Sequence, residues 1–194
     1  MSPLQLCQNE FRTILKPLGY KQQGKNWYSV NELGVIKVIS YNLSSVAIDD
    51  FLFGVEYSIN FIGVQAMVYN RPYELKKCLE VGLIKSSLNL FRQKKSFEFL
   101  PNTPTSSLID YARDRISGEA IPFLSKFDKG ADIAIFLEEN LEQFVNSDSI
   151  LVLSLAALHV HLGNKQRGIE LAKKIISQSK VPFPFAEDFF SRIS

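Results

Sequence analysis

The sequence is poor in the residues from which cross-links and metal sites are most often built. It has two cysteines, Cys7 and Cys78, and two histidines among 194 residues. Two thiols do not make a disulfide framework, and neither has a second cysteine or a histidine at the spacing of metal ligands. Both lie among apolar neighbours, so we interpret them as small core residues. We expect neither a disulfide-bonded fold nor a metal site.

Neither charge nor hydrophobicity is concentrated in one part of the chain. The 22 basic and 20 acidic side chains give a formal net charge of +2, which is too close to neutral to indicate nucleic acid or an anionic membrane as a partner. No apolar run approaches the roughly 18–20 residues of a membrane span. The amino-terminal residues lack the basic and apolar regions of a secretory signal. We therefore expect a cytoplasmic protein.

Motifs that carry a reaction are also missing. The 10 glycines are scattered, so none forms a phosphate-binding loop after a strand, and no serine or cysteine occupies a nucleophile elbow. His159 and His161 stand two residues apart on a predicted helix, where side chains point about 200° apart and cannot bind one ion. A histidine that faces the core is expected to be hydrogen-bonded and structural. We expect no enzyme activity and no cofactor.

The clearest pattern in the sequence is the alternation of residues 51–62. Apolar side chains occupy the odd positions from Phe51 to Phe61, whereas Gly54, Glu56 and other small or polar residues occupy most even positions. This period of two predicts a long strand with one buried face and one face toward solvent. Residues 27–30 and 35–43 predict two further strands, which would form an antiparallel meander with 51–62 because the connections are short.

Helices are predicted on both sides of this sheet region. Residues 3–18 repeat apolar side chains at helical spacing, and Tyr20 to Asn26 is a polar connector. Pro72 starts a predicted short helix over 72–80. Residues 81–91 fit a strand about as well as a helix. We favour a strand that forms a hairpin with 97–100, which gives a sheet of about five strands.

Everything after the break at 101–105 is predicted to be helical. An apolar stripe after Ser107 ends at Gly118, and Asp132 can cap a later helix. The helix over 149–162 is apolar nearly all round and is therefore expected to be central. We predict an α+β fold, with an α+β sheet region over 1–104 and a helical region over 105–194 packed on it as one compact unit.

Candidate partner-binding residues lie on one predicted helical face. Asp132, Glu138, Glu139 and Glu142 stand opposite the apolar stripe of their helix. Such a face is commonly just solvated, and the alternative is a docking patch for a basic protein, because complementary charge steers association. Two other hypotheses remain open: an enzyme that uses the adjacent carboxylates Asp49 and Asp50, and an RNA-binding module built on Lys94 and Lys95.

The amino-terminal half resembles a bacterial family catalogued as domain of unknown function 4304. The resemblance rests on a helix that ends in Leu15-Lys-Pro-Leu-Gly-Tyr-Lys21, on Trp27-Tyr28, on Gly34-Val-Ile-Lys-Val-Ile39 and on the strand 51–62. It covers residues 5–65 well and 75–145 loosely, and Ile121-Pro-Phe-Leu124 is also similar. Because families of this kind often accompany polymorphic toxins, the resemblance implies an immunity-type protein that binds and neutralises a cognate toxin domain, and it implies no catalytic residues.

The segment from Leu155 to Lys174 is similar to a single tetratricopeptide hairpin. Gly163 stands at the predicted turn, and Gly168 occupies the position where the two helices of such a hairpin cross. One copy does not make an array, because stacking needs several repeats. We therefore predict a packed helical hairpin in this part of the chain.

Overall fold

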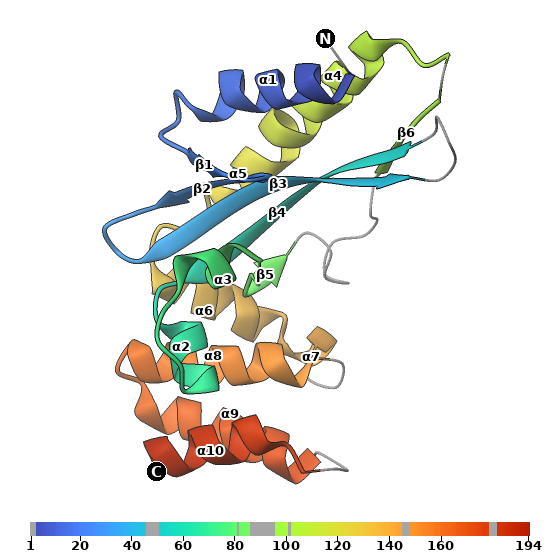
Figure 1. The fold of residues 1–194 in the computed structure, drawn as a ribbon. Helices are drawn as coiled ribbons and strands as arrows, with labels where there is room; N and C mark the ends of the chain where they lie inside the picture. Colours follow the sequence, from blue (N-terminus) through green and yellow to red (C-terminus); the bar gives the residue numbers. More distant parts are fainter. Residues whose placement is uncertain are drawn as a thin grey trace. The chain divides into compact units, whose positions relative to one another are not determined.

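The computed structural model describes residues 3–45, 51–80, 82–85, 96–100, 102–144, 148–178 and 182–194 (Figure 1). The chain has an antiparallel sheet, an amino-terminal helix and a helical carboxyl-terminal half, so the predicted α+β class is confirmed. Its residues group into two compact units. Unit 1 comprises 1–30, 36–59 and 84–126, and unit 2 comprises 31–35, 60–83 and 127–194. This grouping differs from the expected division at residue 104.

The sheet is built outward from the predicted meander. Its strands are β1 (Lys21–Gln23), β2 (Asn26–Val30), β3 (Val35–Ser45), β4 (Phe51–Phe61), β5 (Ile84–Lys85) and β6 (Ser96–Phe99). The order is β1-β2-β3-β4-β5, and β6 also pairs with β4. The connector expected over 20–26 therefore contains a short strand. Residues 81 and 86–91 of the hairpin predicted for 81–91 with 97–100 lie outside the described residues. Within the described residues, β5 and β6 each pair with a different stretch of β4.

The long strand β4 follows the predicted alternation over its first half. Phe53, Val55 and Tyr57 are buried, and the residues between them are partly exposed. From Ser58 to Phe61 every residue is buried, so the solvent-facing row expected at Ser58 and Asn60 is wrong. Burial of a polar amide is tolerated where it finds partners, and the Nδ2 group of Asn60 donates to the carbonyl oxygen of Cys78 at 3.0 Å.

The helices of unit 1 cover the sheet through aromatic contacts. Helix α1 (Pro3–Leu15) packs against α4 (Thr105–Arg113), and Figure 1 shows these two helices side by side. The ring of Phe11 meets that of Tyr41 edge-on, with centroids 5.7 Å apart. The π-helical turn η1 (Asp114–Ala120) and α5 (Ile121–Leu124) continue α4 without a break. The sequence predicts that this helical stripe ends at Gly118, but the helical segment continues through that residue.

Unit 2 is organised around one buried helix. Its helices are α2 (Val64–Tyr69), α3 (Leu75–Glu80), α6 (Gly130–Glu139), α7 (Leu141–Phe144), α8 (Ser149–His161), α9 (Lys165–Gln178) and α10 (Pro184–Ile193). Every residue of α8 from Leu151 to Leu158 is buried, and α8 contacts α2, α6, α7 and α9. The central position predicted for this helix is confirmed.

Helices α8 and α9 form the predicted hairpin. Gly163 adopts a φ of 85° in the turn between them, a conformation that favours glycine. Gly168 lies where the helices cross. A methyl carbon placed there would stand 2.5 Å from Cγ2 of Val160 and 2.8 Å from the backbone oxygen of Ala156. The close approach of the two helices therefore depends on the absence of a side chain at Gly168.

Both cysteines are core residues, as the sequence predicts. Cys7 and Cys78 are each about 1% exposed, and burial, with a smaller contribution from Glu10, raises the pKa of the Cys7 thiol to about 11. Because the thiolate is the reactive species, we expect neither thiol of the native protein to react readily with a disulfide reagent at about pH 8. Both should react within the mixing time in denaturant; rapid reaction of a native thiol would contradict this burial.

Candidate functional site

A cleft on unit 2 opens between α6 and the end of α8. Its volume is about 370 Å³, and we call it the α6–α8 cleft. The residues that line it are Ala131, Ala134, Ile135, Glu138, Glu139, His159, Leu162 and Asn164. Two of its apolar side chains are exposed to an unusual degree for their size, Ile135 at 57% and Leu162 at 41%. The cleft is therefore lined by four apolar and four polar residues.

The wall formed by α6 follows from local sequence signals. Ala131, Ala134 and Ile135 recur at helical spacing and so share one face. The helix begins at Gly130, so Asp132 lies in its first turn and is not the cap residue that the sequence predicted. From there its carboxylate reaches back and accepts hydrogen bonds from the backbone N–H groups of Asp128 at 3.0 Å and Lys129 at 3.1 Å. At the other end, Asn140 donates its side-chain amide to the carbonyl oxygen of Phe136 at 2.8 Å.

The start of α6 is fixed by a glycine as well as by its cap. A methyl carbon at Gly130 would lie 2.8 Å from Cε2 of Phe61 and 3.2 Å from Cδ2 of Leu162. The ring of Phe61 also packs edge-on against His161, with centroids 5.1 Å apart. The helix can approach these side chains because Gly130 has none of its own.

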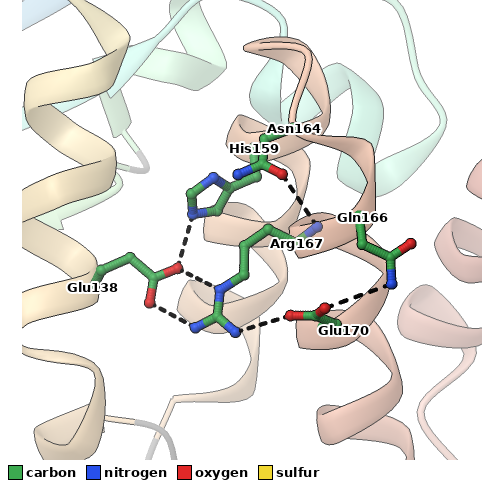
Figure 2. Close-up of polar contacts among 6 residues, drawn as sticks. All are labelled: Glu138, His159, Asn164, Gln166, Arg167 and Glu170. Carbon is green, nitrogen blue, oxygen red and sulfur yellow. Dashed lines mark hydrogen bonds and ion pairs between the residues drawn. The ribbon is translucent and has the colours of Figure 1, made fainter.

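Two residues that line the cleft, Glu138 and His159, belong to an ion-pair network that joins three helices (Figure 2). Glu138 of α6 accepts two hydrogen bonds from Arg167 of α9, Nε to Oε1 and Nη2 to Oε2, both at 2.8 Å. His159 of α8 places its Nε2 2.9 Å from the same Oε1. We call Glu138, His159 and Arg167 the Glu138 brace. A bidentate arginine–carboxylate pair of this kind is among the stronger polar contacts in proteins.

Neighbouring side chains hold Arg167 in this position. Its Nη1 donates to Glu170 Oε2 at 3.2 Å, and its backbone N–H donates to Oδ1 of Asn164 at 3.4 Å. Gln166 in turn donates its side-chain amide to Glu170 at 3.5 Å (Figure 2). The hydrogen bonds from Arg167, with a smaller contribution from His159, hold the pKa of Glu138 below its ordinary value, and the bonds to Glu138 raise the pKa of Arg167.

The chemistry of the Glu138 brace is that of a structural contact. Both oxygens of Glu138 are engaged, and its lowered pKa makes it a poor general base near neutral pH. The residues that line the cleft include no hydroxyl or thiol that could act as a nucleophile. His159 is hydrogen-bonded, as expected for a structural histidine, and His161 faces the ring of Phe61 instead.

The Glu138 brace makes stability dependent on pH in a defined direction. The folded-state pKa of Glu138 lies below its ordinary value of 4.5, so the stabilisation is complete above that value and is lost as the pH falls through the folded-state pKa. We expect the difference in free energy of unfolding between wild type and Glu138→Gln to shrink as the pH falls below about 4.5. Urea denaturation at each pH measures it, and a difference that grows on acidification would contradict the assignment.

Four acidic residues were predicted to bind a partner, and the structure divides them into two pairs. Asp132 and Glu138 are occupied by the helix cap and by the Glu138 brace. Glu139 and Glu142 are exposed. Within the described part of the chain, neither of these two carboxylates has an ionic or hydrogen-bonded partner. Glu139 also lines the α6–α8 cleft, so an uncompensated negative charge stands beside its apolar wall.

A buried arginine in unit 1 was missed by the sequence reasoning. Arg115 lies in the π-helical turn, is about 8% exposed and pairs with Glu119. Among the described residues its Nε has no hydrogen-bond acceptor. A π-helical turn shifts the side chains that follow it around the helix axis, and nothing in the helical spacing of the sequence indicates where such a turn will occur.

The remaining candidates from the sequence, Asp49, Asp50, Lys94 and Lys95, lie outside the described residues. Among the residues that are described, no three or more His, Cys, Asp or Glu side chains come together as metal ligands could. In the same ranges, no helix has both the length and the apolar character needed to cross a membrane.

Comparison with known proteins gives no relative. No family model, no curated protein and no solved structure matches the chain. The likeness of residues 5–65 to the domain of unknown function 4304 therefore remains a prediction from the residues that carry it.

Proposed function

We propose that this protein is a non-enzymatic binding protein whose partner is another protein. The observation that carries the proposal is the pair of exposed carboxylates Glu139 and Glu142, beside an apolar cleft lined by no nucleophile. Exposed aliphatic side chains with charged residues at their edge are typical of protein docking sites. The partner would meet α6 and α7 with a basic surface, because complementary charge steers association and fixes register.

The charge of this surface disfavours other classes of partner. Phosphate groups of nucleic acids and of anionic lipids would be repelled by Glu139 and Glu142, since binding to either depends on neutralisation by lysine and arginine. Arg167, the arginine of the Glu138 brace, has its charge already compensated by Glu138 and Glu170. A basic protein surface meets no such repulsion.

The narrower proposal is an immunity protein that neutralises a cognate toxin domain in the bacterial cytoplasm. It is supported by the resemblance of residues 5–65 to an immunity-type family. An immunity protein needs a complementary surface and no active site, which agrees with the character of the α6–α8 cleft. Toxin domains that act on nucleic acids are commonly basic, because they must neutralise phosphate groups, and such a domain would complement Glu139 and Glu142.

An affinity pull-down with the tagged full chain tests the proposal. The bait is compared with the Glu139→Lys/Glu142→Lys variant and with Glu98→Lys/Glu187→Lys, which makes the same charge change at exposed carboxylates of β6 and α10. We expect one stoichiometric protein on wild type and on the control, and a strongly reduced amount on the first variant. A toxin partner should arrest growth when expressed alone and should be neutralised by co-expression. No partner on any bait would contradict the proposed function.

A further inference from the structure

We infer that the α6–α8 cleft receives one aliphatic side chain of the partner, followed or preceded by a lysine or arginine that pairs with Glu139. The inference rests on the proposed function and adds the chemistry of the segment that is recognised. Three observations support it: the size of the cleft, the exposure of its apolar side chains, and the difference between Glu138, which is paired, and Glu139, which has no partner among the described residues.

The size and lining of the cleft fit an aliphatic side chain. Its volume of about 370 Å³ is at the lower end of the roughly 300–1,000 Å³ of small-molecule sites, so it has room for one aliphatic side chain together with part of its neighbour. Ala131 and Ala134 contribute only short side chains to the α6 side of the cleft. Ile135 and Leu162, which also line it, are 57% and 41% exposed. Covering these two side chains removes apolar surface from water, which stabilises a complex.

The two glutamates that line the cleft determine which charge is favoured on the partner residue next to the inserted aliphatic side chain. Glu138 and Glu139 are adjacent in sequence and both line the cleft. Glu138 is neutralised by the two hydrogen bonds from Arg167 (Figure 2), whereas Glu139 has no partner among the described residues. A cationic side chain beside the inserted aliphatic group would pair with Glu139, and an anionic one would be repelled. Glu142 does not line the cleft, but it is a further exposed carboxylate, three residues along the chain on α7.

The test uses a randomised heptapeptide display library, panned on the full chain. Three proteins are panned in parallel: wild type, Ile135→Gln and Glu139→Lys. Glutamine is a good helix former, and Ile135 is mostly exposed, so the first variant keeps the fold. Leu100→Gln is the matched control, because Leu100 is 42% exposed and does not line the cleft.

We expect wild type and Leu100→Gln to enrich peptides in which Leu, Ile, Val or Met adjoins Lys or Arg. Ile135→Gln should lose this enrichment about tenfold. Glu139→Lys should keep the aliphatic preference and exchange the basic neighbour for Asp or Glu. No enrichment, enrichment of sequences without the aliphatic–basic pair, or enrichment equal on Ile135→Gln would overturn the inference.

These outcomes are separable from those of the proposed function. A protein partner that is lost with Glu139→Lys/Glu142→Lys but retained fully by Ile135→Gln would leave the proposed function standing and would overturn the inference. The absence of a partner in the pull-down would instead remove the function on which the inference rests.

Discussion

Gly168→Ala is expected to lower the free energy of unfolding by about 1–2 kcal/mol, although alanine is the better helix former. The methyl carbon would stand 2.8 Å from the backbone oxygen of Ala156 and 2.5 Å from Cγ2 of Val160. The backbone atom cannot move by a change of rotamer, so α9 must shift away from α8. The strain of overpacking, about 1–3 kcal/mol, then exceeds the gain of roughly 1 kcal/mol in helix propensity.

Gly118→Ala is the matched control for this prediction. Gly118 also lies within a helical segment, but a methyl carbon there meets no atom within 4 Å. Alanine should therefore stabilise the protein by about 0.5–1 kcal/mol. Urea denaturation followed by circular dichroism measures both variants. Equal stabilisation by the two substitutions would show that α8 and α9 do not cross at Gly168.

The second large effect is expected at the Glu138 brace. Glu138→Ala removes the acceptor of Arg167 and His159 together and should lower the free energy of unfolding by about 1–2 kcal/mol. This loss is smaller than the roughly 3–5 kcal/mol that breaking a fully buried ion pair costs, because the Glu138 and Arg167 side chains are 27% and 35% exposed. Solvent screens the pair to that extent.

A double-mutant cycle separates the contribution of the ion pair to the free energy of unfolding from the effect of losing either side chain. Glu138→Ala, Arg167→Met and the double variant should give a coupling of about 1 kcal/mol, because each single change removes the bidentate contact and leaves its partner with only the weaker contact to Glu170 or His159. Chemical denaturation near pH 7 supplies the three differences. Strict additivity of the two single effects would mean that the pair contributes nothing and that α6, α8 and α9 are held by apolar packing alone.

The elements with strong periodicity could be predicted from the sequence. The alternation over 51–62 and the continuous apolar character of 149–162 led to β4 and to the central helix α8, since each pattern has one structural solution. The crossing position of Gly168 was also predictable, because a close approach of two helices requires a residue without a side chain. Asp132 was expected to precede its helix, but it lies in the first turn, after the cap residue Lys129.

The errors arose where tertiary contacts override a local pattern. Ser58 and Asn60 are polar and alternate with apolar residues, yet both are buried, and the amide of Asn60 finds the carbonyl oxygen of Cys78. Glycine commonly stands at the end of a helix, but the helical segment continues through Gly118. The pairing of β5 and β6 with β4 could not be inferred, because residues 84–85 are too short a strand to carry a period.

The candidate site was predicted in outline and corrected in detail. The four carboxylates were expected on one helical face, but three lie on α6 and Glu142 lies on the separate helix α7. Spacing also treats the four carboxylates alike. The contact of Glu138 with Arg167 joins residues 29 positions apart, and no local pattern in the sequence indicates it. The structure therefore leaves Glu139 and Glu142 as the charges available to a partner. Their substitution alone, without Glu138, separates binding from stability.

Docking of a basic protein partner on α6 and α7 is measured by the affinity of the purified partner for three forms of the full chain: wild type, Glu139→Lys/Glu142→Lys and Glu98→Lys/Glu187→Lys. Isothermal titration calorimetry should give a dissociation constant at least about tenfold weaker for the first variant and unchanged for the control. Both variants should lose a similar amount of stability, about 1 kcal/mol or less, because each places one lysine in the first turn of a helix, at Glu142 or at Glu187. Equal affinity of all three forms would contradict docking on α6 and α7, and with it the proposal that these helices bind a basic protein partner.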